Sequence, residues 1–91
     1  MDNFFSIITV VLNAREDLAN TIQSLKKQSF KKFEYIVIDG NSTDGSKELI
    51  ERNKDFISKY LIENDNGIYD AMNKGLKISK GKYVGFINAG D

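Results

Sequence analysis

Three apolar runs of this sequence each end in polar side chains that could do chemistry. Asn13 follows the first of these runs, Asp39-Gly40 the second, and the segment 88–91 (Asn-Ala-Gly-Asp) the last. If the runs are parallel strands, their carboxyl ends meet at one edge of a sheet, where open α/β sheets bind ligands. Glycines there let the backbone approach a ligand closely, and the Asp91 carboxylate suits Mg²⁺ or Mn²⁺. The sequence therefore predicts a ligand site at this edge, with Asp91 as a candidate metal ligand.

Several of these polar residues also have a purely structural interpretation. Asp39 is as well suited to capping the turn after its strand as to contacting a ligand. Further along, Asp44 or Ser46 is expected to be the N-cap of a helix. Asn73 lies in a helical stretch, where Asn has poor propensity, and we expect its side chain to have a partner. The residues alone leave both interpretations of Asp39 open.

The hydrophobic pattern supplies the elements that position these residues. Short β-branched runs are typical of strands buried in a parallel sheet, and apolar residues at helical spacing indicate amphipathic helices. The third helix is expected to bury a face that carries Ile68 and Met72. The βαβαβαβ order predicts an α/β fold, in which a mostly parallel sheet lies between helices. The expected strands are 5–12, 33–38, 59–62 and 83–87, and the expected helices are 16–28, 46–53 and 69–79.

Composition narrows the chemistry that is available. The 13 basic and 13 acidic residues cancel, so the chain as a whole has no field that would attract nucleic acid. It has no cysteine and no histidine, which leaves acid–base or metal chemistry to Asp and Glu. No apolar run approaches the roughly 20 residues that span a bilayer, and the start Met1-Asp2-Asn3 lacks the basic residues of a signal peptide. We therefore expect a cytoplasmic protein.

Five blocks of the sequence together cover almost the whole chain. The blocks are Phe5 to Asn13, Ser24 to Glu34, Ile38 to Ser46, Asp65 to Gly75, and Gly81 to Asp91. In this order they resemble the family 2 glycosyltransferases of the GT-A fold, and the form of the fourth block is the one common in bacterial polysaccharide biosynthesis. The resemblance is specific for the family, although it does not specify the sugar.

The resemblance implies the N-terminal, nucleotide-sugar-binding half of a GT-A domain. The full enzyme would transfer a sugar, with inversion, from a UDP- or GDP-linked donor to a glycan or lipid-linked acceptor. A divalent metal, Mn²⁺ or Mg²⁺, would be held by Asp91 and would assist departure of the diphosphate. The residues implied to bind the nucleotide sugar are Val10, Leu12, Asn13, Asp39, Gly40, Gly67, Asn73, Asn88, Ala89 and Gly90.

The catalytic base and the acceptor half are expected beyond residue 91. Residues 1–91 would then be a partial GT-A domain without catalytic residues of its own, and inactive by itself. The remainder of the protein would also decide whether it sits at the inner face of the membrane. Strand 83–88 would lack the neighbour it has in the whole fold, so we expect self-association through this edge.

The sequence departs from the family pattern at two places. Gly40 stands where many members have a second acid that contacts the base of the nucleotide. Asn88 and Gly90 replace acids of the fuller motif after the fourth strand, so Asp91 is the acid left to hold a metal.

Two other functions stay open. A non-catalytic nucleotide-binding module fits the same residues. A nucleotidyltransferase would need a basic, glycine-rich loop after the first strand, and the segment 13–17 has one Arg and no glycine. A dinucleotide-binding dehydrogenase is disfavoured, because no Gly-x-Gly-x-x-Gly motif follows that strand.

Overall fold

The computed structural model describes residues 5–29 and 32–89. Strands and helices alternate along the chain as predicted, and each boundary lies within two residues of the prediction. The elements are β1 (Phe5–Val11), α1 (Arg15–Lys26), β2 (Phe33–Asp39), α2 (Ser46–Arg52), β3 (Lys59–Ile62), α3 (Ile68–Ile78) and β4 (Tyr83–Phe86).

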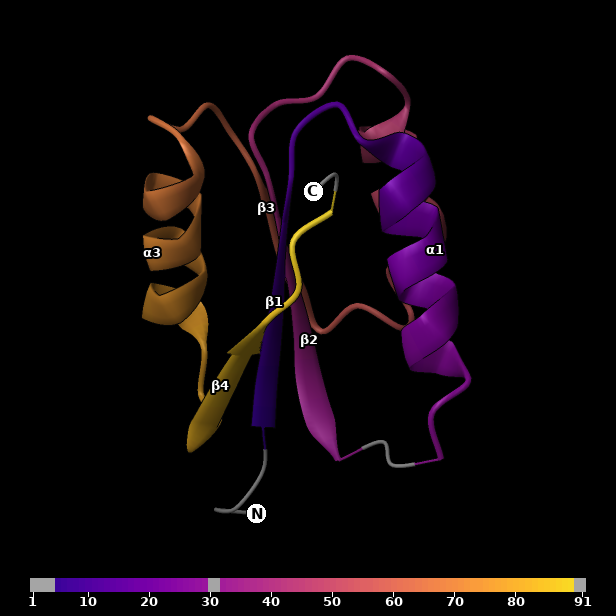
Figure 1. The fold of residues 1–91 in the computed structure, drawn as a ribbon, viewed down its shortest axis with the longest axis vertical. Helices are drawn as coiled ribbons and strands as arrows, with labels where there is room; N and C mark the ends of the chain where they lie inside the picture. Colours follow the sequence, from indigo (N-terminus) through magenta and orange to yellow (C-terminus); the bar gives the residue numbers. More distant parts are fainter. Residues whose placement is uncertain (1–4, 30–31, 90–91) are drawn as a thin grey trace.

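The four strands form one parallel sheet in the order β3-β2-β1-β4. β1 is central, and its last residue, Val11, is paired with Asp39 at the end of β2. Since all strands run the same way, their carboxyl ends lie at the same edge, as predicted. Figure 1 shows α3 against one face of the sheet and α1 against the other, which confirms the three-layer α/β fold.

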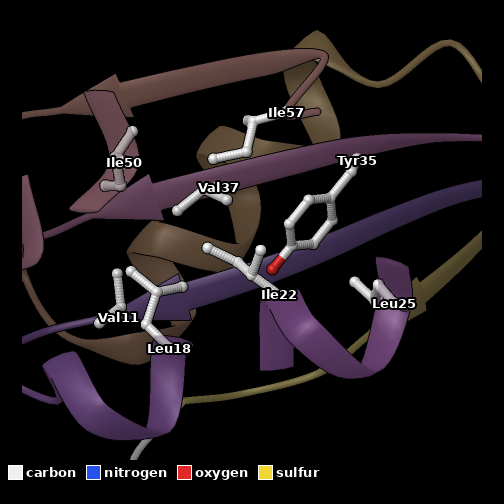
Figure 2. Packing of buried hydrophobic residues seen from close by; sticks show 8 residues of the cluster. All are labelled: Val11, Leu18, Ile22, Leu25, Tyr35, Val37, Ile50 and Ile57. Carbon is white, nitrogen blue, oxygen red and sulfur yellow. The ribbon is translucent and has the colours of Figure 1, made fainter. Parts of the chain in front are cut away.

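Each face of the sheet carries its own hydrophobic core. Figure 2 shows the larger one, in which side chains from α1 and α2 meet β1 and β2. The Tyr35 hydroxyl donates a hydrogen bond to Thr9 Oγ1 at 2.9 Å inside this core. Burial raises the pKa of Tyr35 to about 12, although the hydrogen bond with Thr9 opposes the shift. The phenol is therefore a neutral part of the packing.

The face that α3 buries differs from the prediction. Ala71 and Gly75 are the buried residues of this helix, whereas Ile68 is 43% exposed and Met72 lies at the margin of the core. A Cβ atom at Gly75 would lie 2.6 Å from Cγ2 of Ile8, which is fully buried on β1. The small residues let the helix backbone come close to the sheet, and so Ile68 is left beside the sheet edge.

Glu34 organises the opposite, amino-terminal end of the sheet. Its Oε2 accepts hydrogen bonds from Ser6 Oγ, at 2.6 Å, and from the backbone N–H of Lys80, and its Oε1 lies 3.2 Å from Lys59 Nζ. Burial acts to raise the pKa of Glu34, but the hydrogen bonds from Ser6, Lys80 and Lys59 outweigh it and hold the pKa below the ordinary value. The carboxylate thus ties three strands and the approach to β4 together.

Candidate functional site

An open pocket of about 180 Å³ lies at the carboxyl edge of the sheet. The end of β1 and the segment after β4 form two of its walls, and the start of α3 with the turn before it forms another. Predicted site residues from all three segments share this pocket. The lining residues are Val10, Val11, Leu12, Asp65, Gly67, Ile68, Ala71, Asn88 and Ala89.

The segment after β4 is held against β1, which brings Asn88 into the pocket. The N–H of Ile87 donates to the carbonyl of Ile8 at 2.9 Å, and the N–H of Ala89 donates to that of Val10 at 3.1 Å. Asn88 Oδ1 is buried and has no hydrogen-bond partner among the described residues. A buried acceptor without a donor is costly, so this oxygen is suited to a ligand or a hard cation.

Asp39 caps the turn after β2, which is the structural one of its two sequence-based interpretations. Its carboxylate is fully buried, and Oδ1 accepts hydrogen bonds from the N–H and the Oγ of Ser42, at 3.0 and 2.6 Å. These bonds cap the turn after β2. Oδ2 is also buried but has no partner in the part of the chain that the structure describes. Asp39 does not line the pocket. One of its oxygens stabilises the turn beside the pocket, and the other has no hydrogen-bond partner among the described residues.

Asn13 is used within the protein. It adopts a left-handed backbone conformation, with φ of 52°. Its N–H donates to Ser42 Oγ at 2.8 Å, and its Oδ1 accepts from the N–H of Thr43 at 2.8 Å. The loops after β1 and β2 are thereby joined, which makes Asn13 a positioning residue in this structure.

One carboxylate holds the starts of α1 and α2. Asp44 Oδ2 accepts from the N–H of Arg15 at 3.0 Å, and Oδ1 accepts from the N–H and Oγ of Ser46 at 3.1 and 2.7 Å. The N-cap of α2 is Gly45, with φ of 98°, rather than Asp44 or Ser46. The hydrogen bond from Ser46 Oγ, followed by those from the backbone of Arg15 and Ser46, lowers the pKa of Asp44 despite slight desolvation.

Gly40 and Asp65 meet beside the pocket. A Cβ atom at position 40 would lie 2.8 Å from Asp65 Oδ2. Asp65 is not among the predicted site residues, because it lies in a cluster of Asn, Asp and Gly residues that is typical of a turn. Its contact with Gly40 depends on how the turns after β2 and β3 come together, and no local pattern carries that information.

The remaining predicted residues lie away from the pocket or outside the described part. Asn73 is exposed on α3, does not line the pocket, and has no side-chain hydrogen bond among the described residues. Gly90 and Asp91 lie outside the described residues. Within residues 5–29 and 32–89, no group of three or more acidic residues could hold a metal ion.

Comparison with known proteins identifies the family. The sequence model of "Glycosyl transferase family 2" matches residues 6–91, nearly the whole chain. The chain belongs to glycosyl transferase family 2. The resemblance seen in the five sequence blocks is thereby confirmed.

Similar glycosyltransferases come from several bacteria. The UDP-Glc:alpha-D-GlcNAc-diphosphoundecaprenol beta-1,3-glucosyltransferase WfaP of Escherichia coli is 34% identical over 89 residues, which cover 94% of this chain and 35% of WfaP. A PGL/p-HBAD biosynthesis glycosyltransferase of Mycobacterium bovis is 33% identical over 90 residues, or 96% of this chain and 35% of that protein. The chain thus spans about a third of the length of these relatives.

Solved structures agree with the GT-A fold. The crystal structure of TarS residues 1–349 from S. aureus in complex with UDP-GlcNAc superposes with a TM-score of 0.83 at 30% identity, over 94% of this chain and 26% of that one. The mannosyltransferase PcManGT from Pyrobaculum calidifontis has a TM-score of 0.86 at 21% identity, over 98% of this chain and 28% of that one. The second likeness concerns the fold alone.

Proposed function

We propose that this chain is the donor-binding part of a glycosyltransferase that binds a nucleotide diphosphate sugar. The observation that carries the proposal is the pocket shared by the end of β1, the segment after β4 and the start of α3. TarS, whose structure this chain resembles, was solved in complex with UDP-GlcNAc. The name of WfaP specifies UDP-Glc as the donor and a lipid-linked sugar as the acceptor. Transfer with inversion to a glycan or lipid-linked acceptor, by a protein longer than this chain, belongs to the same proposal.

The residues of the pocket suit the parts of such a donor. Val10 and Leu12 offer apolar surface to a flat base, and Leu12 is 57% exposed and free to take up a ligand contact. The amino-terminal end of α3, which begins at the pocket wall, carries the positive end of the helix dipole and favours a diphosphate. The free Asn88 Oδ1 would accept a hydrogen bond from a sugar or ribose hydroxyl.

A divalent cation is also part of the proposal. Asn88 Oδ1, a buried oxygen without a partner among the described residues, lies in the pocket and suits a hard cation. Asp91, three residues later in the sequence, would supply a carboxylate. One carboxylate is sufficient for an ion that keeps waters and binds a diphosphate. PcManGT, of the same fold, was solved with GDP-Man and Mn²⁺. A bound ion would neutralise the charge that develops on the leaving diphosphate.

Binding measurements separate this proposal from a metal-independent nucleotide module. We expect UDP-GlcNAc, UDP or GDP-Man to bind more tightly with Mn²⁺ than without it in isothermal titration calorimetry. Asp91→Ala should abolish the metal effect, and Asn88→Ala should weaken binding by about tenfold, which corresponds to one lost hydrogen bond. Asp55→Ala, remote from the pocket, is the control.

Two outcomes would contradict the proposal in different ways. Binding that ignores both Mn²⁺ and Asp91 would favour the plain nucleotide module. No binding of any nucleotide by the folded chain would overturn donor binding altogether.

A cytoplasmic location stays a prediction. Separately, no helix in the described residues is long and apolar enough to cross a membrane.

A further inference from the structure

Asp65 is the one charged residue that lines the pocket within the described part of the chain. It lies in the turn between β3 and α3. Its Oδ1 accepts a hydrogen bond from the N–H of Gly67 at 3.1 Å, which fixes the orientation of the carboxylate. Its Oδ2 has no donor among the described residues, so it is available to a ligand.

The absence of a side chain at Gly40 makes room for this oxygen. Asp65 Oδ2 lies 2.8 Å from the place that a Cβ atom at position 40 would take. A larger residue there would push the Asp65 carboxylate away from its present position. The turn after β3 therefore delivers a carboxylate to the space beside the end of β2.

The rest of the pocket wall defines what such a carboxylate could recognise. Leu12 and Ile68, which both line the pocket, are 57% and 43% exposed and offer apolar contact to the face of a flat ring. An ionised carboxylate only accepts hydrogen bonds, so the edge of the ring must donate. At the centre of the pairing edge, uracil and guanine present a ring N–H, whereas cytosine and adenine present a ring nitrogen that accepts. Cytosine and adenine donate there only through the exocyclic amine to one side of that nitrogen.

We propose that Asp65 is the residue that selects the base of the nucleotide, favouring uracil or guanine over cytosine and adenine. The proposal rests on the proposed donor binding and adds the residue that gives it base specificity. A ring N–H pairs with Asp65 Oδ2. In cytosine or adenine, the lone pair of the ring nitrogen would face a lone pair of Asp65 Oδ2. Because both atoms would be left without a donor, the site should discriminate strongly against these bases.

The first test compares four nucleotides on matched variants. The 91-residue chain is titrated with UDP, GDP, CDP and ADP as wild type, Asp65→Asn and Glu63→Gln. Asp65→Asn keeps the oxygen that accepts from Gly67, and its amide can donate to a ring nitrogen. Glu63→Gln makes the same charge change nearby and is the control. Glu63 does not line the pocket, and its Oε2 lies 3.0 Å from Lys74 Nζ.

We expect the wild type to bind UDP or GDP at least about tenfold more tightly than CDP or ADP. Asp65→Asn should lose about tenfold in affinity for the preferred nucleotide and bring CDP or ADP close to it, since one charge-assisted hydrogen bond is exchanged for a weaker one. Glu63→Gln should keep the wild-type preference. Circular dichroism of each variant confirms that it is folded.

A transplant of the carboxylate provides the second test. Asp65→Gly removes both the carboxylate and the atom that crowds position 40, and the backbone of Gly40 is not in the left-handed region. Adding Gly40→Asp should therefore be tolerated and should restore part of the lost preference.

The outcomes separate this proposal from the one on which it rests. If the folded wild type binds none of the four nucleotides, the proposed donor binding fails. If the wild type binds with a preference that Asp65→Asn leaves unchanged, the role of Asp65 is refuted and donor binding stands. Failure of Gly40→Asp to restore any preference in a folded Asp65→Gly chain would also count against base selection by this carboxylate.

Discussion

Removal of the Glu34 carboxylate should destabilise the fold at the end far from the pocket. Glu34→Ala leaves the hydroxyl of Ser6, which is fully buried, without its acceptor. A buried hydrogen bond to a charged group is worth about 1.5–3 kcal/mol. The pair with Lys59, whose side chain is 32% exposed, adds at most about 1 kcal/mol. The expected loss is therefore about 2–4 kcal/mol of the free energy of unfolding.

Urea unfolding followed by circular dichroism measures this loss. With a slope of about 1–2 kcal/mol per molar urea, the midpoint should fall by about 2 M. Glu48→Ala, an exposed residue in the first turn of α2, is the matched control and should cost less than about 1 kcal/mol. Nucleotide binding well below the midpoint should be unchanged, since Glu34 lies at the opposite end of the sheet.

The pH dependence of this effect has a defined sign. Because the folded-state pKa of Glu34 lies below the ordinary value of 4.5, its contribution is complete above that value and is lost as the pH falls through the lowered pKa. The difference between wild type and Glu34→Gln should therefore shrink in more acidic solution. An unchanged midpoint for Glu34→Ala would refute the reasoning, and so would a difference between wild type and Glu34→Gln that does not shrink as the solution is acidified.

Three further predictions concern α3, the helix starts and the sheet edge. Gly75→Ala gains about 1 kcal/mol of helix propensity but forces a methyl group against Ile8 at a cost of about 1–3 kcal/mol. Urea unfolding should therefore show a net loss in the free energy of unfolding. A stabilised variant would contradict the close packing of α3 against the sheet. Asp44→Ala should lower the melting temperature at neutral pH and matter less as the pH falls through the lowered pKa of Asp44; melting curves that coincide at every pH would disprove this. Self-association through β4, an edge strand with Val84 36% exposed, should be reduced by Val84→Lys in light scattering, and a wild type that stays monomeric at high concentration would contradict it.

The glycine and polar residues that follow the strands were predictable because strand ends are marked locally. A buried run that stops at Asn13, Asp39 or Asn88 is visible in the sequence, and parallel strands must bring these ends to one edge. The family pattern then pointed to Val10 and Gly67, which do line the pocket. For Asp39, however, the sequence could not show that Oδ1 caps the turn while Oδ2 has no partner among the described residues. That difference depends on the position of Ser42 in the folded chain.

Sequence by itself determined the elements, their order and the polar character of one sheet edge, because periodicity and turn residues act over a few neighbouring positions. Tertiary structure decided which of these residues meet. β4 lies beside β1, so Asn88 reaches the pocket, and Gly75 rather than Ile68 faces the sheet because only a small residue fits against Ile8. The approach of Asp65 to Gly40 joins turns 25 positions apart, between residues 40 and 65. Such a contact depends on strand register and loop path together, and neither is written in the local pattern.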